Sequence, residues 1–346
     1  MEEIMGYRIG FDIGSTTIKA VVLDENNQIC YKSYERHKAQ VRQKALDKLV
    51  ELKKYTKEPF KFAISGSGAL GLCEQGELPF VQEVFASATG VSKLYSETDC
   101  AIELGGEDAK ILFFQGSVEQ RMNSTCAGGT GAFIDQMSTL LNMSLEEMNE
   151  ASLNYHRLYP IASRCGVFAK TDIQPLINQG VDKCDLCASI FQAVVDQTIT
   201  SLAQGRKIEG NILFLGGPLY FMSGLRKRFV ETLKLSDVQV NCPETAINFV
   251  ALGTAICADQ EYTYDELYKV LEDLVHAPAK LTESKPLFES EEDYQKFIGR
   301  HKSHDAKYAK LKDYAGKAYL GIDSGSTTTK LVLLDENDAI LYDSYT

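Results

Sequence analysis

The sequence feature that most constrains the fold is a long internal duplication. Residues Gly10–Glu35 read GFDIGSTTIKAVVLDENNQICYKSYE and residues Gly321–Thr346 read GIDSGSTTTKLVLLDENDAILYDSYT, with 16 of 26 aligned positions identical. The copies are offset by 311 residues, whereas solenoid repeats run to roughly 20 to 50 residues. The duplication therefore indicates a repeated domain. Because the second copy stops at Thr346, where its strands need partners, we expect the chain to be the front of a longer tandem protein.

The composition is that of a globular protein. Apolar residues make up 44% and charged residues 24% of the 346 residues, which argues against a disordered or fibrous chain. The 48 acidic and 36 basic side chains leave a net charge of -12. We therefore expect no nucleic-acid partner and no membrane, because phosphate polyanions bind basic surfaces. No signal-peptide pattern and no apolar stretch of membrane-spanning length is recognised, so we expect a cytoplasmic protein.

Strand and helix signals alternate along the chain and then restart. Tyr7–Ile13 and Ile18–Asp24 are predicted to be adjacent strands joined by a polar turn, and Cys100–Leu104 with Lys110–Phe114 repeats this pattern. Two related halves of this kind indicate an α/β fold with mixed sheets. The predicted divisions are lobe I at 1–95 plus 246–262, lobe II at 96–245, a helical charged connector at 263–317, and the truncated start of the second repeat at 318–346.

The turn after the first strand has the residues of a phosphate-binding loop. Its small residues let backbone amides approach phosphate oxygens, its hydroxyls add donors, and a lysine adds positive charge. Asp12 can hold Mg²⁺ through water. A plain polar hairpin turn is the alternative. The predicted nucleotide-binding residues of this loop are Gly14, Ser15, Thr16, Thr17 and Lys19.

Two further glycine turns follow predicted strands. One carries Gly105 and Gly106 between Glu103 and Asp108, and the other reads Gly216-Gly217-Pro218. Each is a weak signal alone. Together the three turns resemble the phosphate 1, phosphate 2 and adenosine motifs of the acetate kinase, sugar kinase, heat-shock ATPase and actin superfamily. That resemblance implies an actin-like ATPase fold, with a nucleotide in a cleft between two related lobes. No G-x-G-x-x-G between a strand and a helix supports a dinucleotide site.

Two of the nine cysteines precede predicted helices. Cys126 comes before Ala132–Leu141, and Cys165 comes before Phe168–Gln179. In a chain without an export signal cysteines are reduced thiols, and a helix N-terminus favours the thiolate that ligates metals. Two thiolates make half of a four-thiolate iron–sulfur site, and a symmetric dimer would supply the other half.

Other interpretations of the cysteines stay open. A lone cysteine is usually a small buried hydrophobe, which is the alternative for Cys126 and Cys165. Cys184 and Cys187 have the spacing of a metal motif, but no second pair accompanies them. They are therefore weaker candidates for ligands.

The cysteine motifs and the nucleotide loops together resemble one family. Asn123–Phe133 matches the pattern NxxCAxGTGxF, and Ser163–Asp172 matches SRCxVFxxTD. Both patterns resemble the BadF/BadG/BcrA/BcrD ATPase family, and most closely its activators of 2-hydroxyacyl-CoA dehydratases, over roughly residues 7 to 262. The repeat at Gly321 resembles the start of the second module in large activases of this family.

The resemblance implies a homodimer bridged by one 4Fe-4S cluster, with Cys126 and Cys165 of each subunit as ligands. It implies that ferredoxin or flavodoxin reduces the cluster, and that binding and hydrolysis of ATP to ADP drive one low-potential electron into a dehydratase partner. Asp12, Glu103 and Asp108 take the catalytic and Mg²⁺ positions. A domain-closing cleft is a two-state element, and a cluster seated on helix ends would respond to it.

The sequence departs from the family pattern at three places. Glu103 and Glu107 stand where the family usually has Asp and Gln, so we expect the water and Mg²⁺ to be held differently and hydrolysis to be slow. Ser87 lies in a segment that usually reads Glu-x-x-Cys-His-Ala-Lys-Gly. The alternative functions are a small-molecule kinase of the amino-sugar type, which would lack a cluster, and a binding module whose ATPase has decayed, which would not bind ATP.

Overall fold

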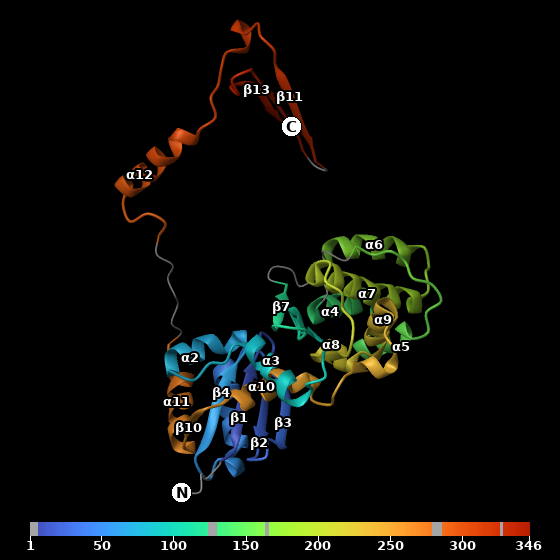
Figure 1. Cartoon of the computed structure of the whole chain (residues 1–346), viewed down its shortest axis with the longest axis vertical. Coiled ribbons are helices and arrows are strands. Elements are labelled where there is room, and N and C mark those ends of the chain that lie inside the picture. Colours follow the sequence, from blue (N-terminus) through green and yellow to red (C-terminus); the bar gives the residue numbers. More distant parts are fainter. Residues whose placement is uncertain (1–5, 124–129, 163–165, 279–285, 326–327) are drawn as a thin grey trace. The chain divides into compact units, whose positions relative to one another are not determined.

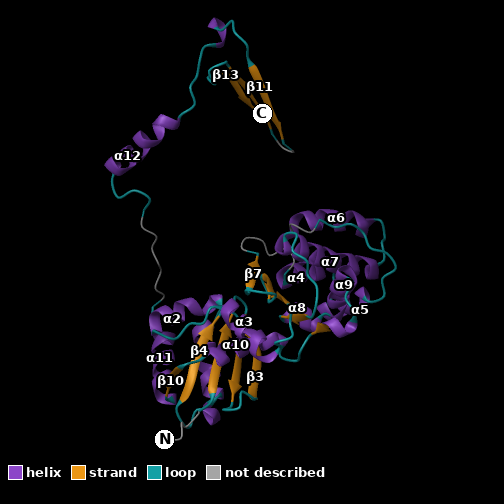
Figure 2. Ribbon diagram, viewed as in Figure 1, coloured by secondary structure: helices purple, strands orange, loops and turns teal. Residues whose placement is uncertain are grey.

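The structure is a computed structural model of the whole chain. It describes residues 6–123, 130–162, 166–278, 286–325 and 328–346. The chain forms two compact units, residues 1–279 and 280–346. The first unit contains two five-stranded sheets, each with its own helices, and we call these parts lobe I and lobe II (Figures 1 and 2).

Lobe I is built on a sheet whose strand order is β10-β4-β1-β2-β3. Its central strand β1 is buried at five of its six residues, as expected for a strand with helices on both faces. On one face of the sheet, α1 and α11 share an apolar core with β1 and β4. Helix α10 also packs against β1, β2 and β4, but its side chains belong to a different core. The elements of lobe I are β1 (Arg8–Ile13), β2 (Thr17–Leu23), β3 (Ile29–Arg36), α1 (Val41–Glu51), β4 (Phe60–Ser65), α2 (Leu70–Gly76), α3 (Glu83–Leu94), α10 (Phe249–Cys257), β10 (Gln260–Tyr262) and α11 (Tyr264–His276).

Lobe II is built on a sheet whose strand order is β7-β6-β5-β8-β9. Figure 1 shows α4, α5, α6, α7 and α9 gathered in this lobe, away from the sheet of lobe I. The elements of lobe II are β5 (Cys100–Leu104), β6 (Ala109–Phe113), β7 (Glu119–Met122), α4 (Gly131–Leu141), α5 (Leu145–Ser152), α6 (Gly166–Asn178), α7 (Lys183–Thr198), β8 (Ile212–Leu215), α8 (Gly217–Phe221), α9 (Ser223–Leu233) and β9 (Val240–Asn241).

The two lobes share one topology, as their sequence patterns predict. In each lobe the first strand is antiparallel to the second and parallel to the fourth: β1 pairs with β2 and β4, and β5 pairs with β6 and β8. The first turn of each lobe therefore lies at the same end of an equivalent hairpin. The registers also correspond, because Asp12 lies opposite Lys19 and Glu103 lies opposite Lys110.

A separate apolar core joins the lobes. It contains Val21 and Leu23 of lobe I, Leu112 and Leu213 of lobe II, and much of α3 and α10. These two helices pack closely at Gly253, where a Cβ atom would stand 2.0 Å from the carbonyl oxygen of Ala86. The close backbone approach requires glycine at this position.

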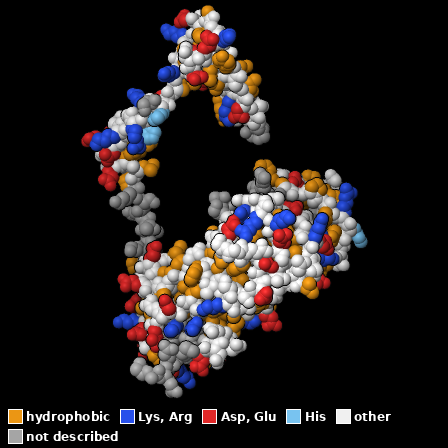
Figure 3. Space-filling model, in the orientation of Figure 1, with side chains coloured by type: hydrophobic (Ala, Val, Ile, Leu, Met, Phe, Trp, Pro, Cys, Tyr) orange, Lys and Arg blue, Asp and Glu red, His pale blue; other side chains and the backbone are white. Residues whose placement is uncertain are grey.

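One helix of lobe II is apolar enough to raise the question of a membrane. The stretch Lys183–Ala203, which is α7 continued by a π-helical segment, could cross a bilayer by length and composition, and 72% of its most apolar part is buried inside the protein. Phe191, Val194 and other α7 side chains belong to the core of lobe II. It is therefore a core helix. Figure 3 shows acidic and basic side chains interspersed on the visible face of this unit.

Helix α11 (Tyr264–His276) falls within the stretch 263–317 that is predicted to be a charged connector. Helix α11 packs on lobe I, with Leu267, Leu271 and Leu274 buried in its core. The compact unit ends at residue 279. A charged helix can still belong to a domain when one stripe of it is apolar.

The second unit contains α12 (Glu291–His301) and a three-stranded sheet of β11 (Tyr319–Ser324), β12 (Thr329–Leu334) and β13 (Ile340–Tyr345). Its first hairpin repeats that of lobe I residue for residue: Tyr319 lies opposite Leu334 and Asp323 opposite Lys330, as Arg8 lies opposite Leu23 and Asp12 opposite Lys19. The six residues of β11 are exposed, whereas those of β1 are mostly buried. The duplicated sequence thus forms the same hairpin without the surrounding lobe.

Candidate functional site

The two lobes enclose a cleft lined by all three glycine turns. A cavity of about 410 Å³ adjoins the turns of both lobes and the start of α8. A second cavity of about 870 Å³ shares the first two turns and extends along α3. Every predicted catalytic and nucleotide-binding residue lines one or both cavities. The structure thus brings together side chains that are up to 206 residues apart, from Asp12 to Pro218.

The first turn joins β1 to β2 and carries Gly14, Ser15, Thr16 and Thr17. The backbone N–H of Gly14 donates to the carbonyl of Thr17 over 2.9 Å, which closes the turn. These four residues line the larger cavity, and Thr16 and Thr17 line both.

A cross-strand ion pair stands beside this turn. Lys19 Nζ lies 2.7 Å from the Asp12 carboxylate, and the Asp12 side chain is only 4% exposed. Burial alone would lower the pKa of Lys19, but the charge and hydrogen bond of Asp12 raise it above its usual value. Lys19 is therefore a cation whose charge is already partly balanced by Asp12.

His37 fixes the first turn through hydrogen bonds to its backbone. Its Nε2 lies 3.0 Å from the carbonyl oxygen of Gly14, its Nδ1 accepts the N–H of Ala39, and its backbone N–H donates to Thr16. Because Nδ1 is an acceptor here, the neutral ring places its proton on Nε2 and donates it to Gly14. The buried ring thus fixes the loop that carries the hydroxyls.

The second turn joins β5 to β6 and is surrounded by charge. Lys110 is 3% exposed and lies 2.7 Å from Asp108, 3.5 Å from Glu103 and 2.5 Å from Glu83 on α3 of lobe I. Burial alone would lower the pKa of Lys110, whereas these three carboxylates raise it well above its usual value. The ion pair with Glu83 also joins lobe II to lobe I.

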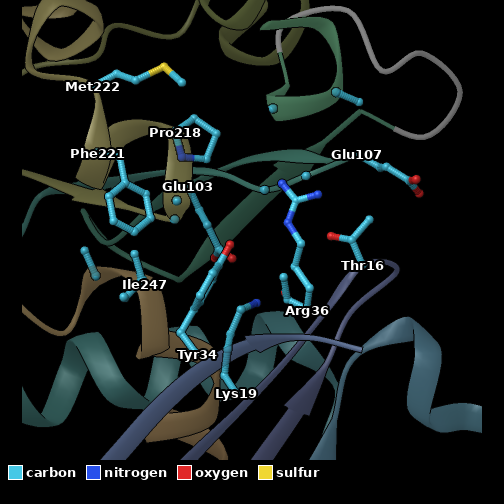
Figure 4. A pocket seen from close by; sticks show the side chains of 18 of the residues that line it. Thr16, Lys19, Tyr34, Arg36, Glu103, Glu107, Pro218, Phe221, Met222 and Ile247 are labelled. Atoms are coloured by element: carbon cyan, nitrogen blue, oxygen red, sulfur yellow. The ribbon is translucent and has the colours of Figure 1, made fainter. Parts of the chain in front are cut away.

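Glu103 projects toward the cleft from the end of β5 (Figure 4). Burial raises the pKa of its carboxyl, with the charges of Asp108, Glu83 and Asp12 acting in the same direction, and Lys110 opposes this shift. The hydroxyl of Ser87 donates to Glu103 Oε2 over 3.2 Å. Two of the departures from the family pattern, Glu103 and Ser87, therefore contact each other.

The third turn leaves β8 and begins α8. Gly216 has a φ of +87°, and a Cβ atom there would stand 2.0 Å from the carbonyl oxygen of Leu104, so this position requires glycine. Gly217 and Pro218 form the first turn of α8 and line the smaller cavity. Phe221 ends the helix.

The cavity beside α8 is apolar and aromatic. Phe221 of lobe II and Tyr34 of lobe I line it side by side in an edge-to-face contact, with ring centroids 6.2 Å apart, and Met222 and Ile247 complete this end (Figure 4). Aromatic and apolar side chains of this kind suit a purine ring. The cleft therefore has a polar end at the first two turns and an apolar end at the third.

The segment that carries Cys126 begins and ends at the second turn. Asn123 donates its backbone N–H to the carbonyl of Ala109 and accepts the Ala109 N–H on its side chain. At the other end, the N–H groups of Gly131 and Ala132, which begin α4, donate to the carbonyls of Gly105 and Gly106 over 3.0 and 2.8 Å. Four hydrogen bonds thus anchor the two ends of this segment to the turn.

Both predicted metal ligands, Cys126 and Cys165, lie outside the described residues. What can be placed are the helices that follow them. Helix α6 begins at Gly166, directly after Cys165, and Ile173 of α6 shares one apolar core with Ile134 of α4. Within the described ranges, no group of three His, Cys, Asp or Glu side chains is arranged to hold a metal ion.

Several residues of the cleft do not figure in the sequence-based prediction of the site, among them Tyr34, Arg36, His37 and Lys110. A sequence signal exists for Lys110 alone among them. Asp12 and Lys19, Glu103 and Lys110, and Asp323 and Lys330 all share a spacing of seven residues around a glycine turn. This recurrence marks Lys110 as the counterpart of Lys19.

A pair of topologically equivalent lobes with glycine turns around a shared cleft defines an ATPase of the actin-like fold. Residues 9–258 match the BadF/BadG/BcrA/BcrD ATPase family. The chain belongs to this family, which confirms the predicted resemblance and the prediction of an ATPase.

The chain is similar to curated proteins with a named role. It is 28% identical over 258 residues to the activator of lactoyl-CoA dehydratase from Anaerotignum propionicum, which covers 73% of this chain and 97% of that protein. It is 26% identical over 256 residues to the (R)-2-hydroxyglutaryl-CoA dehydratase activating ATPase of Acidaminococcus fermentans, covering 73% and 96%. Both of these relatives are named as activators of 2-hydroxyacyl-CoA dehydratases.

Two solved structures share the fold. The crystal structure of Acidaminococcus fermentans (R)-2-hydroxyglutaryl-CoA dehydratase component A has a TM-score of 0.65 at 24% identity and covers 77% of this chain and 99% of that one. The activator of the 2-hydroxyisocaproyl-CoA dehydratase from Clostridium difficile, solved with bound ADPNP, has a TM-score of 0.64 at 24% identity and covers 79% and 98%. These likenesses confirm the predicted fold class.

Proposed function

We propose that this protein is an ATP-dependent activator that passes a low-potential electron to a 2-hydroxyacyl-CoA dehydratase or a similar partner. The observation that carries the proposal is the attachment of the Cys126 segment to the second glycine turn at both of its ends. A shift of that turn moves the anchors of Cys126. The names of the relatives support the same role.

The cleft is proposed to bind ATP and, after hydrolysis, ADP. The polar end suits the phosphates, which meet Gly14, Ser15, Thr16, Thr17 and Lys19 on one side and the N–H groups around Gly105 and Gly106 on the other. The apolar end at Gly216, Gly217 and Pro218, with Phe221 and Tyr34, suits the adenine ring. A relative of the same fold was solved with ADPNP.

We propose that carboxylates of the cleft bind a magnesium ion together with water and the nucleotide phosphates, because Mg²⁺ usually takes only one or two carboxylate ligands. Asp12, Glu103 and Asp108 line the larger cavity together, and carboxylate oxygens are the ligands that Mg²⁺ prefers. In our proposal these residues hold the metal and orient the attacking water. In the same proposal Glu103 accepts a proton from that water; burial raises the pKa of its carboxyl, and Ser87 donates a hydrogen bond to it.

The chemistry of the donor set fits a 4Fe-4S cluster shared by two subunits. Cys126 and Cys165 are thiols that precede helices α4 and α6, and these helices pack in one core. Phe168 in the first turn of α6 is 64% exposed, and a large exposed aromatic side chain near the cysteine is typical of an interface. When bound, the cluster would supply a one-electron carrier at low potential.

The proposed cycle assigns a task to each of the two lobes. Ferredoxin or flavodoxin supplies one electron, and the dehydratase receives it. Nucleotide binding closes lobe I on lobe II, and Gly105 and Gly106 transmit the movement to Gly131 and Ala132. We place this cycle in the cytoplasm.

The proposal is tested by iron and sulfide analysis of the anaerobically reconstituted full chain. We expect about four iron atoms per dimer, and loss of iron in Cys126→Ser and in Cys165→Ser. Cys30→Ser is the matched control, because Cys30 is an exposed thiol on β3. Cys184→Ser tests the other candidate ligand.

Full iron content in Cys126→Ser would refute the proposed ligand set. A colourless wild-type protein that phosphorylates a sugar would identify a kinase instead. A protein that fails to bind ATP in calorimetry would identify a binding module.

A further inference from the structure

The charges that line the two cavities are unequally distributed. Seven acidic side chains and three basic ones, Lys19, Arg36 and Lys110, line them. A nucleoside triphosphate is a polyanion, so the cleft as a whole repels it unless bound metal and free cations compensate. The question is which of the three basic residues is available.

Two of the three are already engaged with carboxylates. Lys19 lies 2.7 Å from Asp12, and Lys110 lies within 3.5 Å of three carboxylates. Arg36, by contrast, has no carboxylate within ion-pair distance in the part of the chain that the structure describes. Its charge is therefore the one not balanced by a neighbouring side chain.

The backbone places Arg36 at the polar end of the cleft. It is the last residue of β3 and lies opposite Thr17, the residue that closes the first turn. The next residue, His37, holds Gly14 through its ring. Figure 4 shows the Arg36 side chain reaching from this strand into the cavity.

The same strand also reaches the apolar end. Tyr34, two residues earlier and on the same face, pairs with Phe221, and its hydroxyl lies 3.7 Å from the position of a Cβ on Gly217. Two residues along a strand span roughly 7 Å. The strand β3 therefore runs from the expected adenine end at Tyr34 to the phosphate end at Arg36.

From this geometry we propose that Arg36 binds the phosphate chain of the nucleoside triphosphate, beyond its α-phosphate, from the lobe I side of the cleft. The inference rests on the proposed ATP site and adds a residue to it. A guanidinium offers two parallel N–H donors to one phosphate group, which a lysine cannot do. Because Arg36 comes from lobe I and the second turn from lobe II, a phosphate held by both would draw the lobes together.

The test is calorimetric titration of the full chain with ATP, ADP and AMP in the presence of Mg²⁺. For Arg36→Ala we expect the Kd of ATP to rise about 10- to 100-fold, as for loss of a charge-assisted hydrogen bond. The Kd of AMP should change less than about twofold, and Arg36→Lys should fall between wild type and Arg36→Ala. Lys32→Ala is the control, because Lys32 lies on the same face of β3, pairs with Glu244 and lines neither cavity.

The possible outcomes distinguish a failure of the Arg36 proposal from a failure of the proposed ATP site. If wild type binds ATP and Arg36→Ala binds it within about twofold, the role of Arg36 is refuted and the ATP site stands. If AMP loses as much affinity as ATP, Arg36 contacts the nucleoside or α-phosphate and the proposal is wrong. If wild type itself does not bind ATP, the proposed function fails. The exposed position of Arg36 keeps the fold intact, which far-UV circular dichroism checks.

Discussion

Replacing Lys110 by methionine tests the electrostatic organisation of the cleft. Methionine keeps the apolar stem and removes the charge, leaving Glu83, Glu103 and Asp108 without their common cation. The side chains of Lys110, Glu103 and Glu83 are 3%, 9% and 23% exposed, so their interaction is weakly screened, whereas Asp108 at 37% adds less. Removing one partner of a buried ion pair costs about 3–5 kcal/mol.

The pH dependence of the free energy of unfolding provides a second, independent test with the same variant. In wild type the pKa of Lys110 is raised in the folded state. Its contribution to the free energy of unfolding is therefore fully present below the pKa of lysine in the unfolded chain, and it is lost only as the pH rises through the pKa of the folded state. The wild-type contribution is therefore constant from about pH 6 to about pH 9. In Lys110→Met the carboxyl pKa of Glu103, already raised by burial, rises further, and protonation restores stability as the pH falls.

The measurement is urea unfolding followed by far-UV circular dichroism, since the chain has no tryptophan. We expect Lys110→Met to lose about 3–5 kcal/mol at about pH 8 and clearly less at about pH 5. Lys110→Arg keeps the charge and should lose less at both. A loss below about 1 kcal/mol at the higher pH, or a loss that grows on acidification, would refute the reasoning.

Two further predictions concern the shape of the loops. Gly216→Ala should destabilise the fold by about 1–3 kcal/mol or more, because alanine at a φ of +87° is strained and its Cβ would meet Leu104. Urea unfolding measures this loss, with Gly217→Ala as the control because a Cβ has room at that position. Equal stability of the two variants would contradict the prediction. His37→Ala should weaken ATP binding about three- to tenfold by releasing Gly14, as measured by calorimetry, whereas the exposed His301→Ala should leave the Kd unchanged.

Much of the site could be predicted from the sequence because the loops are local. A glycine turn that follows a buried strand fixes where backbone N–H groups point, and three such turns in order indicate one cleft. The internal duplication also predicts the hairpin of the second unit, in which Asp323 and Lys330 form an ion pair over 2.9 Å as Asp12 and Lys19 do over 2.7 Å. Local sequence is enough for these features.

Contacts between the lobes could not be predicted in the same way. Tyr34 and Phe221 meet although 187 residues separate them, and nothing in either segment indicates the other. The contact of Ser87 with Glu103 depends on how α3 lies across β5.

Helix α11 is an intermediate case, because its charged composition suggests a connector while Leu267, Leu271 and Leu274 follow a helical apolar spacing that predicts burial.

The central claim is that events in the cleft reach the cysteines through the second turn and α4. The most direct test mixes the reduced, cluster-loaded full chain with a 2-hydroxyacyl-CoA dehydratase under anaerobic conditions, with and without ATP and Mg²⁺, and monitors electron transfer by the absorbance of the cluster. The absorbance is bleached in the reduced protein. We predict that it recovers, as the cluster gives its electron to the dehydratase, only when hydrolysable ATP is present. Transfer at the same rate without nucleotide would contradict the account.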